Sequence, residues 1–184
     1  KRVARQIETA HINIDKLIRA LPEIRSMTLE TPAEFSAKLK DKLAQCGIAL
    51  VFLPHLQGSF LQGASFMDGK KIVLGLTVRG KDADKFWFSL FHELGHIVLG
   101  HIGKTDEITE QDENAADLWA KDELIPKEEF EQFKEMQDYS LVSVRDFANK
   151  VGIAPGIVVG RLQKERCITY NMLNELKEQF EIAM

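Results

Sequence analysis

The chain contains 184 residues with a formal net charge of −4, and 45% of its residues are hydrophobic. This balance excludes overall disorder, because enough apolar surface is available to offset the entropy of ordering the chain. The cysteines, Cys46 and Cys167, are far apart, which argues against a disulfide framework and a cysteine zinc site. No apolar run approaches the roughly 18 residues of a membrane helix, and no signal peptide is visible. We therefore expect a soluble, cytoplasmic protein without a membrane partner.

The charge is concentrated in one acidic stretch. Residues 106–138 sum to −10, and the rest of the chain sums to +6. Such a run is usually a solvated helical face, and a net negative chain is poorly suited to hold nucleic acid by its overall field. Because the sequence begins at Lys1 rather than at methionine, we expect it to be a fragment of something longer, in which a preceding domain could bind nucleic acid.

The first predicted elements are helical. Mixed apolar and charged positions over residues 1–20 predict a helix that acts as a connector, and we treat residues 1–30 as an N-terminal helix and linker. The capping-box pattern that begins at Thr31 predicts a second helix over residues 32–46, which Gly47 ends.

A small sheet is predicted next. The apolar run at residues 48–53 is typical of a buried strand. Residues 59–67 and 71–78 flank Asp68-Gly69, the strongest short signal of a hairpin. We expect a three-stranded sheet that contains an antiparallel pair, with its middle segment as a bulged or edge strand.

The remaining pattern is helical. Residues 84–100 are apolar on nearly all sides, which predicts a buried central helix, and residues 112–124 predict a second helix. Further short helices are predicted at about residues 126–137, 143–151, 155–165 and 170–181. The expected fold is α+β, with residues 31–184 as one domain.

The central helix carries the sequence His92-Glu93-Leu94-Gly95-His96, an H-E-x-x-H motif. At about 100° per residue, His92 and His96 lie roughly 40° apart on the helix surface, so both imidazoles can reach one metal ion. Glu93 is placed to take a proton from the attacking water. Zinc suits this donor set and needs a third protein ligand. Ordinary polar residues are the alternative, but two histidines and a glutamate in an apolar helix would be costly to bury without partners.

We favour Glu113 as the third ligand. Asp117 lies four residues further along the same helical face and can accept the second N–H of a ligand histidine. Asp112 and Glu110 compete for the ligand role. His101 is placed half a turn away from the motif face by helical geometry, and we interpret it as a helix-terminal cation or a surface histidine.

The motif residues, followed by Glu113-x-x-Ala116-Asp117-x-Trp119-Ala120 and Leu124-Ile125-Pro126, resemble the ImmA/IrrE family of zinc metallopeptidases. The resemblance covers roughly residues 30–165. It implies a zincin-like domain of the gluzincin type, with His92, His96 and Glu113 as zinc ligands and Glu93 as general base. The segment after Val151 is similar to the end of HigA-like regulators or antitoxins that carry an N-terminal helix-turn-helix. The family resemblance also implies bacterial or phage origin and a protein substrate, typically a DNA-binding repressor.

Three functions remain in view. The first is an active zinc endopeptidase that cleaves a repressor or a stress or toxin–antitoxin regulator. The second is a regulatory or antitoxin module of the same fold without turnover. The third is DNA binding through residues 143–163, which resemble a helix-turn-helix; we interpret that segment as a packing helix pair, because Arg161 occupies a position that normally packs in the core.

Overall fold

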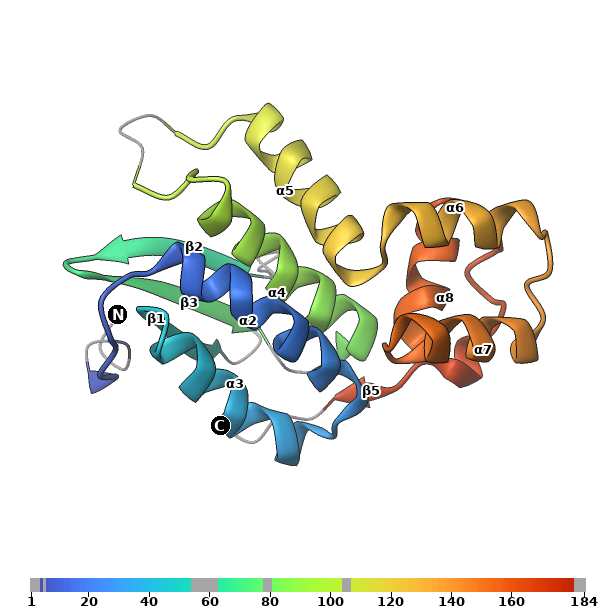
Figure 1. The fold of residues 1–184 in the computed structure, drawn as a ribbon, viewed down its shortest axis with the longest axis horizontal. Coiled ribbons are helices and arrows are strands. Elements are labelled where there is room, and N and C mark those ends of the chain that lie inside the picture. The colour runs from blue at the N-terminus through green and yellow to red at the C-terminus, as the bar shows by residue number, and fades with distance from the viewer. Residues whose placement is uncertain (1–3, 5, 54–62, 78–80, 104–106, 181–184) are drawn as a thin grey trace.

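The computed structural model describes residue 4 and residues 6–53, 63–77, 81–103 and 107–180. These form an α+β fold in which helices pack around a small three-stranded sheet (Figure 1). The predicted fold class is confirmed.

The sheet consists of β1 (Ile48–Leu53), β2 (Gly63–Asp68) and β3 (Lys71–Thr77), in the order β1-β3-β2. β1 pairs with β3 in parallel, and β2 pairs with β3 in antiparallel fashion. The predicted hairpin around Asp68-Gly69 and the predicted three-stranded sheet are therefore both present. Within the described residues, β2 is an edge strand whose outer backbone groups face no other strand.

Helix α4 (Ala83–Val98) is the centre of the molecule and covers one face of the sheet (Figure 1). Strand residues alternate between the two faces. Leu50 and Leu74 belong with α4 to the main core, whereas Ala49 and Val73 form a small separate cluster with Ala4. The apolar pattern of residues 84–100 predicted this buried helix correctly.

The N-terminal part differs from its prediction. Helix α2 (Ile14–Ser26) begins after Asn13, whose side chain accepts a hydrogen bond from the Lys16 N–H, so the predicted helix over residues 1–20 has the wrong bounds. Residues 7–13 are not helical. A 3-10 turn (Met27–Leu29) joins α2 to α3 (Pro32–Ala44), which carries the predicted capping box.

Helix α5 (Glu110–Leu124) packs against α4 along the acidic stretch. Its first turn is capped reciprocally by Thr109 and Asp112. The two helices approach closely at Gly95, where a Cβ atom would lie 3.2 Å from the Ala116 carbonyl oxygen. The small residues Gly95 and Ala116 allow this close approach.

Three helices follow: α6 (Lys127–Glu135), α7 (Leu141–Val151) and α8 (Pro155–Lys164). Most of α8 is buried, and it packs against α4 and α7. The Arg161 side chain is only 9% exposed, donates to the carbonyls of Lys121 and Ile125, and lies over the Phe130 ring. This arrangement agrees with a packing role for the pair α7–α8.

The predicted helix over residues 170–181 is wrong. That segment holds a 3-10 turn (Asn174–Leu176) and a short strand β5 (Gln179–Phe180), which pairs with β4 (Lys81–Asp82). The Gln163 side chain donates to the Tyr170 and Met172 carbonyls, and a helix would need those acceptors for its own N–H groups.

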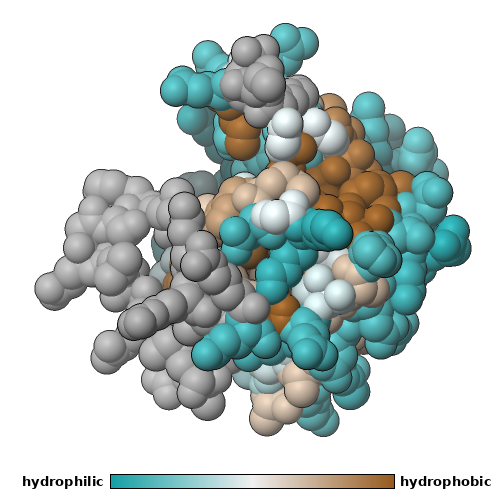
Figure 2. Space-filling model, turned by 90° about the vertical axis from the view of Figure 1, so that its left-hand side faces the viewer, coloured by the Kyte–Doolittle hydropathy of each residue, from teal (hydrophilic) through white to brown (hydrophobic). Residues whose placement is uncertain are grey.

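Figure 2 shows the end of the molecule at which the hairpin and the α4–α5 connection lie, with an area of hydrophobic side chains bordered by hydrophilic ones. Every folded protein leaves part of its apolar surface exposed, so this area alone indicates no partner. Among the described residues, the helices fall short of the length and apolar character needed to cross a membrane.

Candidate metal centre

Helices α4 and α5 bring three metal-binding side chains together. The Nε2 atoms of His92 and His96 are 3.1 Å apart, and Glu113 carboxylate oxygens lie 3.2 Å from His92 Nε2 and 3.5 Å from His96 Nε2. Ligands about 2.0–2.2 Å from a tetrahedral zinc ion would be roughly 3.3–3.5 Å from one another. In the described part of the chain, His92, His96 and Glu113 form a group that could hold a metal ion.

The partners of the other ring nitrogens explain why this group fits a cation. His92 Nδ1 lies 2.8 Å from Asp117, and His96 Nδ1 lies 3.0 Å from His101 Nδ1. A proton on each Nδ1 completes these bonds and leaves a lone pair on each Nε2. The two lone pairs then face one another beside the Glu113 carboxylate, which is unfavourable without a positive charge between them.

The pKa values agree with this arrangement. The hydrogen bond to Asp117 raises the pKa of His92, and burial lowers the pKa of His96. The same bond lowers the pKa of Asp117, which keeps this carboxylate ionised as an acceptor. Asp117 thus lies against the second ring nitrogen of His92.

Glu93 follows His92 on α4 and is 7% exposed. The Ser65 hydroxyl of β2 donates to its carboxylate at 2.5 Å. Gly63 lies so close that a Cβ there would be 2.9 Å from Glu93 Oε1. Burial raises the pKa of Glu93, and the Ser65 hydrogen bond opposes that rise. From the sequence, Ser65 was predicted only as a residue of the strand, with no role at the site.

The interpretation of His101 as a surface residue is wrong. The helix ends at Leu99, and Gly100 takes a left-handed conformation (φ 72°) that reverses the chain. The His101 N–H then bonds the His96 carbonyl, and the Gly100 N–H bonds that of Ile97, the pattern of a Schellman motif. His101 is consequently buried against His96, with Nε2 3.3 Å from Asp112.

The competing carboxylates lie elsewhere. Asp112 contacts His101 and the Thr109 N–H, and the described metal-binding group does not include it or Glu110. A substrate oxyanion would need a further donor, and Tyr170 lines the cleft beside the metal centre. The other tyrosine, Tyr139, packs on Phe133, with its hydroxyl near the Lys134 carbonyl, and is not among the described residues that line the cleft.

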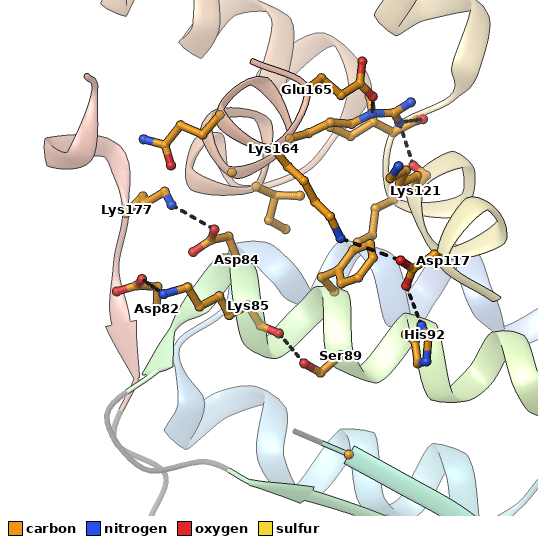
Figure 3. Close-up of a pocket in the computed structure, with 18 of the residues that line it drawn as sticks. Asp82, Asp84, Lys85, Ser89, His92, Asp117, Lys121, Lys164, Glu165 and Lys177 are labelled. Atoms are coloured by element: carbon orange, nitrogen blue, oxygen red, sulfur yellow. Dashed lines mark hydrogen bonds and ion pairs between the residues drawn. The ribbon is translucent and has the colours of Figure 1, made fainter. Parts of the chain in front are cut away.

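The metal centre opens into a cleft of about 1000 Å³. Gly63, His92 and Glu93 line it together with α5 and α8. Charged pairs lie across it, as Figure 3 shows: Lys164 reaches Asp117, and Lys177 reaches Asp84. An extended peptide would have room to pass Glu93 in this cleft.

Comparison with known proteins gives a family for this chain. Residues 47–163 match the model of the IrrE N-terminal-like domain, peptidase family M78. A comparison with curated proteins gives no match. The matched residues include both helices of the metal centre and strands β1–β3. The chain therefore belongs to the IrrE N-terminal-like domain family, peptidase family M78.

Proposed function

We propose that the protein is a zinc-dependent metallo-endopeptidase of the gluzincin type that acts in the cytoplasm. The observation that carries the proposal is the triangle of His92, His96 and Glu113 donor atoms with the Glu93 carboxyl beside it at the cleft. The separations of 3.1–3.5 Å between these donor atoms are close to those around a tetrahedral zinc ion, and the family is one of peptidases.

Each side chain has a distinct task in this proposal. His92, His96 and Glu113 would hold the ion, and Asp117 would keep the His92 ring in place. Zinc would supply Lewis acidity toward the scissile carbonyl and the attacking water. Glu93 would accept the proton of that water and pass it to the leaving amine. Its raised pKa suits the first step, because a carboxylate of higher pKa is a stronger base and accepts the proton of water more readily.

The substrate would bind as an extended strand. Strand β2 is at the edge of the sheet within the described residues and passes Glu93 at Gly63 and Ser65. A peptide added to this edge would gain backbone hydrogen bonds and lie in the cleft. We infer a protein substrate and, from the family resemblance, a DNA-binding repressor or a stress or toxin–antitoxin regulator.

Metal analysis tests the zinc site directly. Wild-type protein should bind close to one zinc ion per chain, and His92→Ala and Glu113→Ala should each lose most of it. Glu93→Gln should retain zinc and fail to cleave the cognate repressor or toxin, because the amide cannot accept the proton. Wild-type protein that binds zinc and the cognate partner without cleaving it would instead favour a regulatory or antitoxin domain.

A further inference from the structure

A line of buried polar contacts joins His96 to the first turn of helix α5. His96 Nδ1 lies 3.0 Å from His101 Nδ1, and His101 Nε2 lies 3.3 Å from Asp112 Oδ1. His96 is 2% exposed and His101 is 8% exposed. Because imidazole rings buried this deeply need partners for their polar atoms, these contacts determine how both rings can sit.

With both imidazole rings neutral, these contacts fit one placement of the protons. The Asp112 carboxylate can only accept, so the proton of a neutral His101 lies on Nε2. His101 Nδ1 then carries a lone pair and accepts from His96 Nδ1–H. This leaves the lone pair of His96 on Nε2, the atom that faces His92 and Glu113.

Asp112 also belongs to the cap of α5. Its Oδ2 accepts from the Thr109 N–H at 3.0 Å and from the Thr109 hydroxyl at 2.8 Å, while its Oδ1 faces His101. One carboxylate therefore connects the end of α4 to the start of α5, one residue before Glu113. The carboxylate that contacts His101 through Oδ1 therefore also caps, through Oδ2, the turn that carries Glu113.

We propose that His101 and Asp112 are positioning residues of the metal centre, which hold the His96 ring and its tautomer ready for the ion as Asp117 does for His92. The inference rests on the proposed zinc site. Neither residue belongs to the described metal-binding group or is among the described residues that line the cleft, so we expect the effect on metal affinity. Removal of such a partner typically weakens metal binding by about 10- to 100-fold.

Zinc affinity of the full chain, measured by competition of the apoprotein with a chelating dye, tests the proposal. His101→Phe keeps a ring of similar size and removes the acceptor, so we expect the zinc Kd to rise by about 10- to 100-fold. His101→Asn returns an acceptor oxygen near the position of Nδ1, and we expect its Kd to recover to within several-fold of the wild type. A purely structural role would not give this rescue.

A second pair of variants separates positioning from helix capping. Asp112→Ala removes the cap and the contact to His101, whereas Thr109→Ala weakens the cap and leaves that contact. We expect Asp112→Ala to bind zinc about tenfold more weakly than Thr109→Ala. This comparison decides the matter if His101→Phe does not fold.

Three results would overturn the inference: an unchanged Kd in a folded His101→Phe protein, an Asn variant as weak as the Phe variant, or equal Kd values for Asp112→Ala and Thr109→Ala. A wild-type apoprotein that binds no zinc would instead refute the proposed function itself, so the two failures are distinguishable.

Discussion

Glu93 is a single residue whose surroundings oppose its ionised form. Burial raises the pKa of its carboxyl, and the neighbouring Glu113 adds to the rise. The Ser65 hydrogen bond and the charge of His92 act in the opposite direction. The pKa of Glu93, the proposed general base, is therefore set partly by Ser65, a strand residue far from the metal-binding residues in the sequence.

Ser65→Ala should raise the pKa of Glu93, because it removes a donor to the ionised carboxylate. A general base works only when deprotonated, so the acidic limb of the kcat/KM profile should move to higher pH. Ser89→Ala is a matched control, since Ser89 lines the same cleft and donates to the Lys85 carbonyl. An acidic limb that stays in place or moves to lower pH contradicts the assignment.

At single residues, prediction from sequence succeeded where the backbone was regular. His92 and His96 are four positions apart inside one helix, so their shared face follows from helical geometry alone. His101 lies past the helix end, and the left-handed Gly100 turns it back onto His96. The rotation of about 100° per residue applies only inside a helix, so it could not place His101. Gly100 could have indicated that the helix ends there and that the chain reverses direction.

At the scale of elements, the metal centre depends on the contact between α4 and α5. A Cβ at Gly95 would lie 3.0 Å from Trp119 Cε3 and 3.2 Å from the Ala116 carbonyl oxygen. The oxygen is backbone and cannot move unless α5 moves. Because Glu113 is on α5, the separation of these two helices sets the size of the ligand triangle.

Gly95→Ala should separate helix propensity from packing. Alanine is more favourable than glycine inside a helix by about 1 kcal/mol. Overpacking against α5 should outweigh that gain and lower the free energy of unfolding by about 1–3 kcal/mol. The displacement of α5 should also weaken zinc binding. Urea denaturation and zinc titration would measure the two effects, with Leu118→Ala on the exposed face of α5 as a control within about 0.5 kcal/mol. A more stable Gly95→Ala with unchanged affinity would show that α5 has room to move.

Elements were predictable when their own residues carried the signal. The capping box at Thr31 and the Asp68-Gly69 turn located α3 and the hairpin. The segment over residues 170–181 looked helical, but contacts from Gln163, on another element, hold it in a non-helical path. Hydrogen bonds from one side chain to two backbone carbonyls do not change the spacing of apolar residues, so the sequence pattern could not indicate them.

At the scale of the whole molecule, the N-terminal helix belongs to the same core as the metal centre. Leu17 and Ile24 of α2 are fully buried in it. Arg25 donates to the carbonyl of Leu124 at 2.9 Å and to that of Val151 at 2.6 Å, which ties α2 to the ends of α5 and α7. The division at residue 30 marks a change in sequence pattern and stays a prediction. Truncation at that residue tests it.

Removal of residues 1–30 should abolish cooperative folding, because it exposes the apolar surface that α2 covers and leaves two buried helix-end carbonyls without their Arg25 donor. A pair of substitutions on α2 gives a graded version of the same test. Leu17→Ala should lower the free energy of unfolding by about 2–5 kcal/mol. Its neighbour Ile18 is 45% exposed, so Ile18→Ala should change stability by less than about 0.5 kcal/mol. Urea denaturation followed by circular dichroism measures all three. A 31–184 fragment that unfolds cooperatively at the wild-type midpoint would make residue 30 a true domain boundary and α2 an appendage, because a helix that contributes nothing to the core can be lost without effect on the unfolding transition.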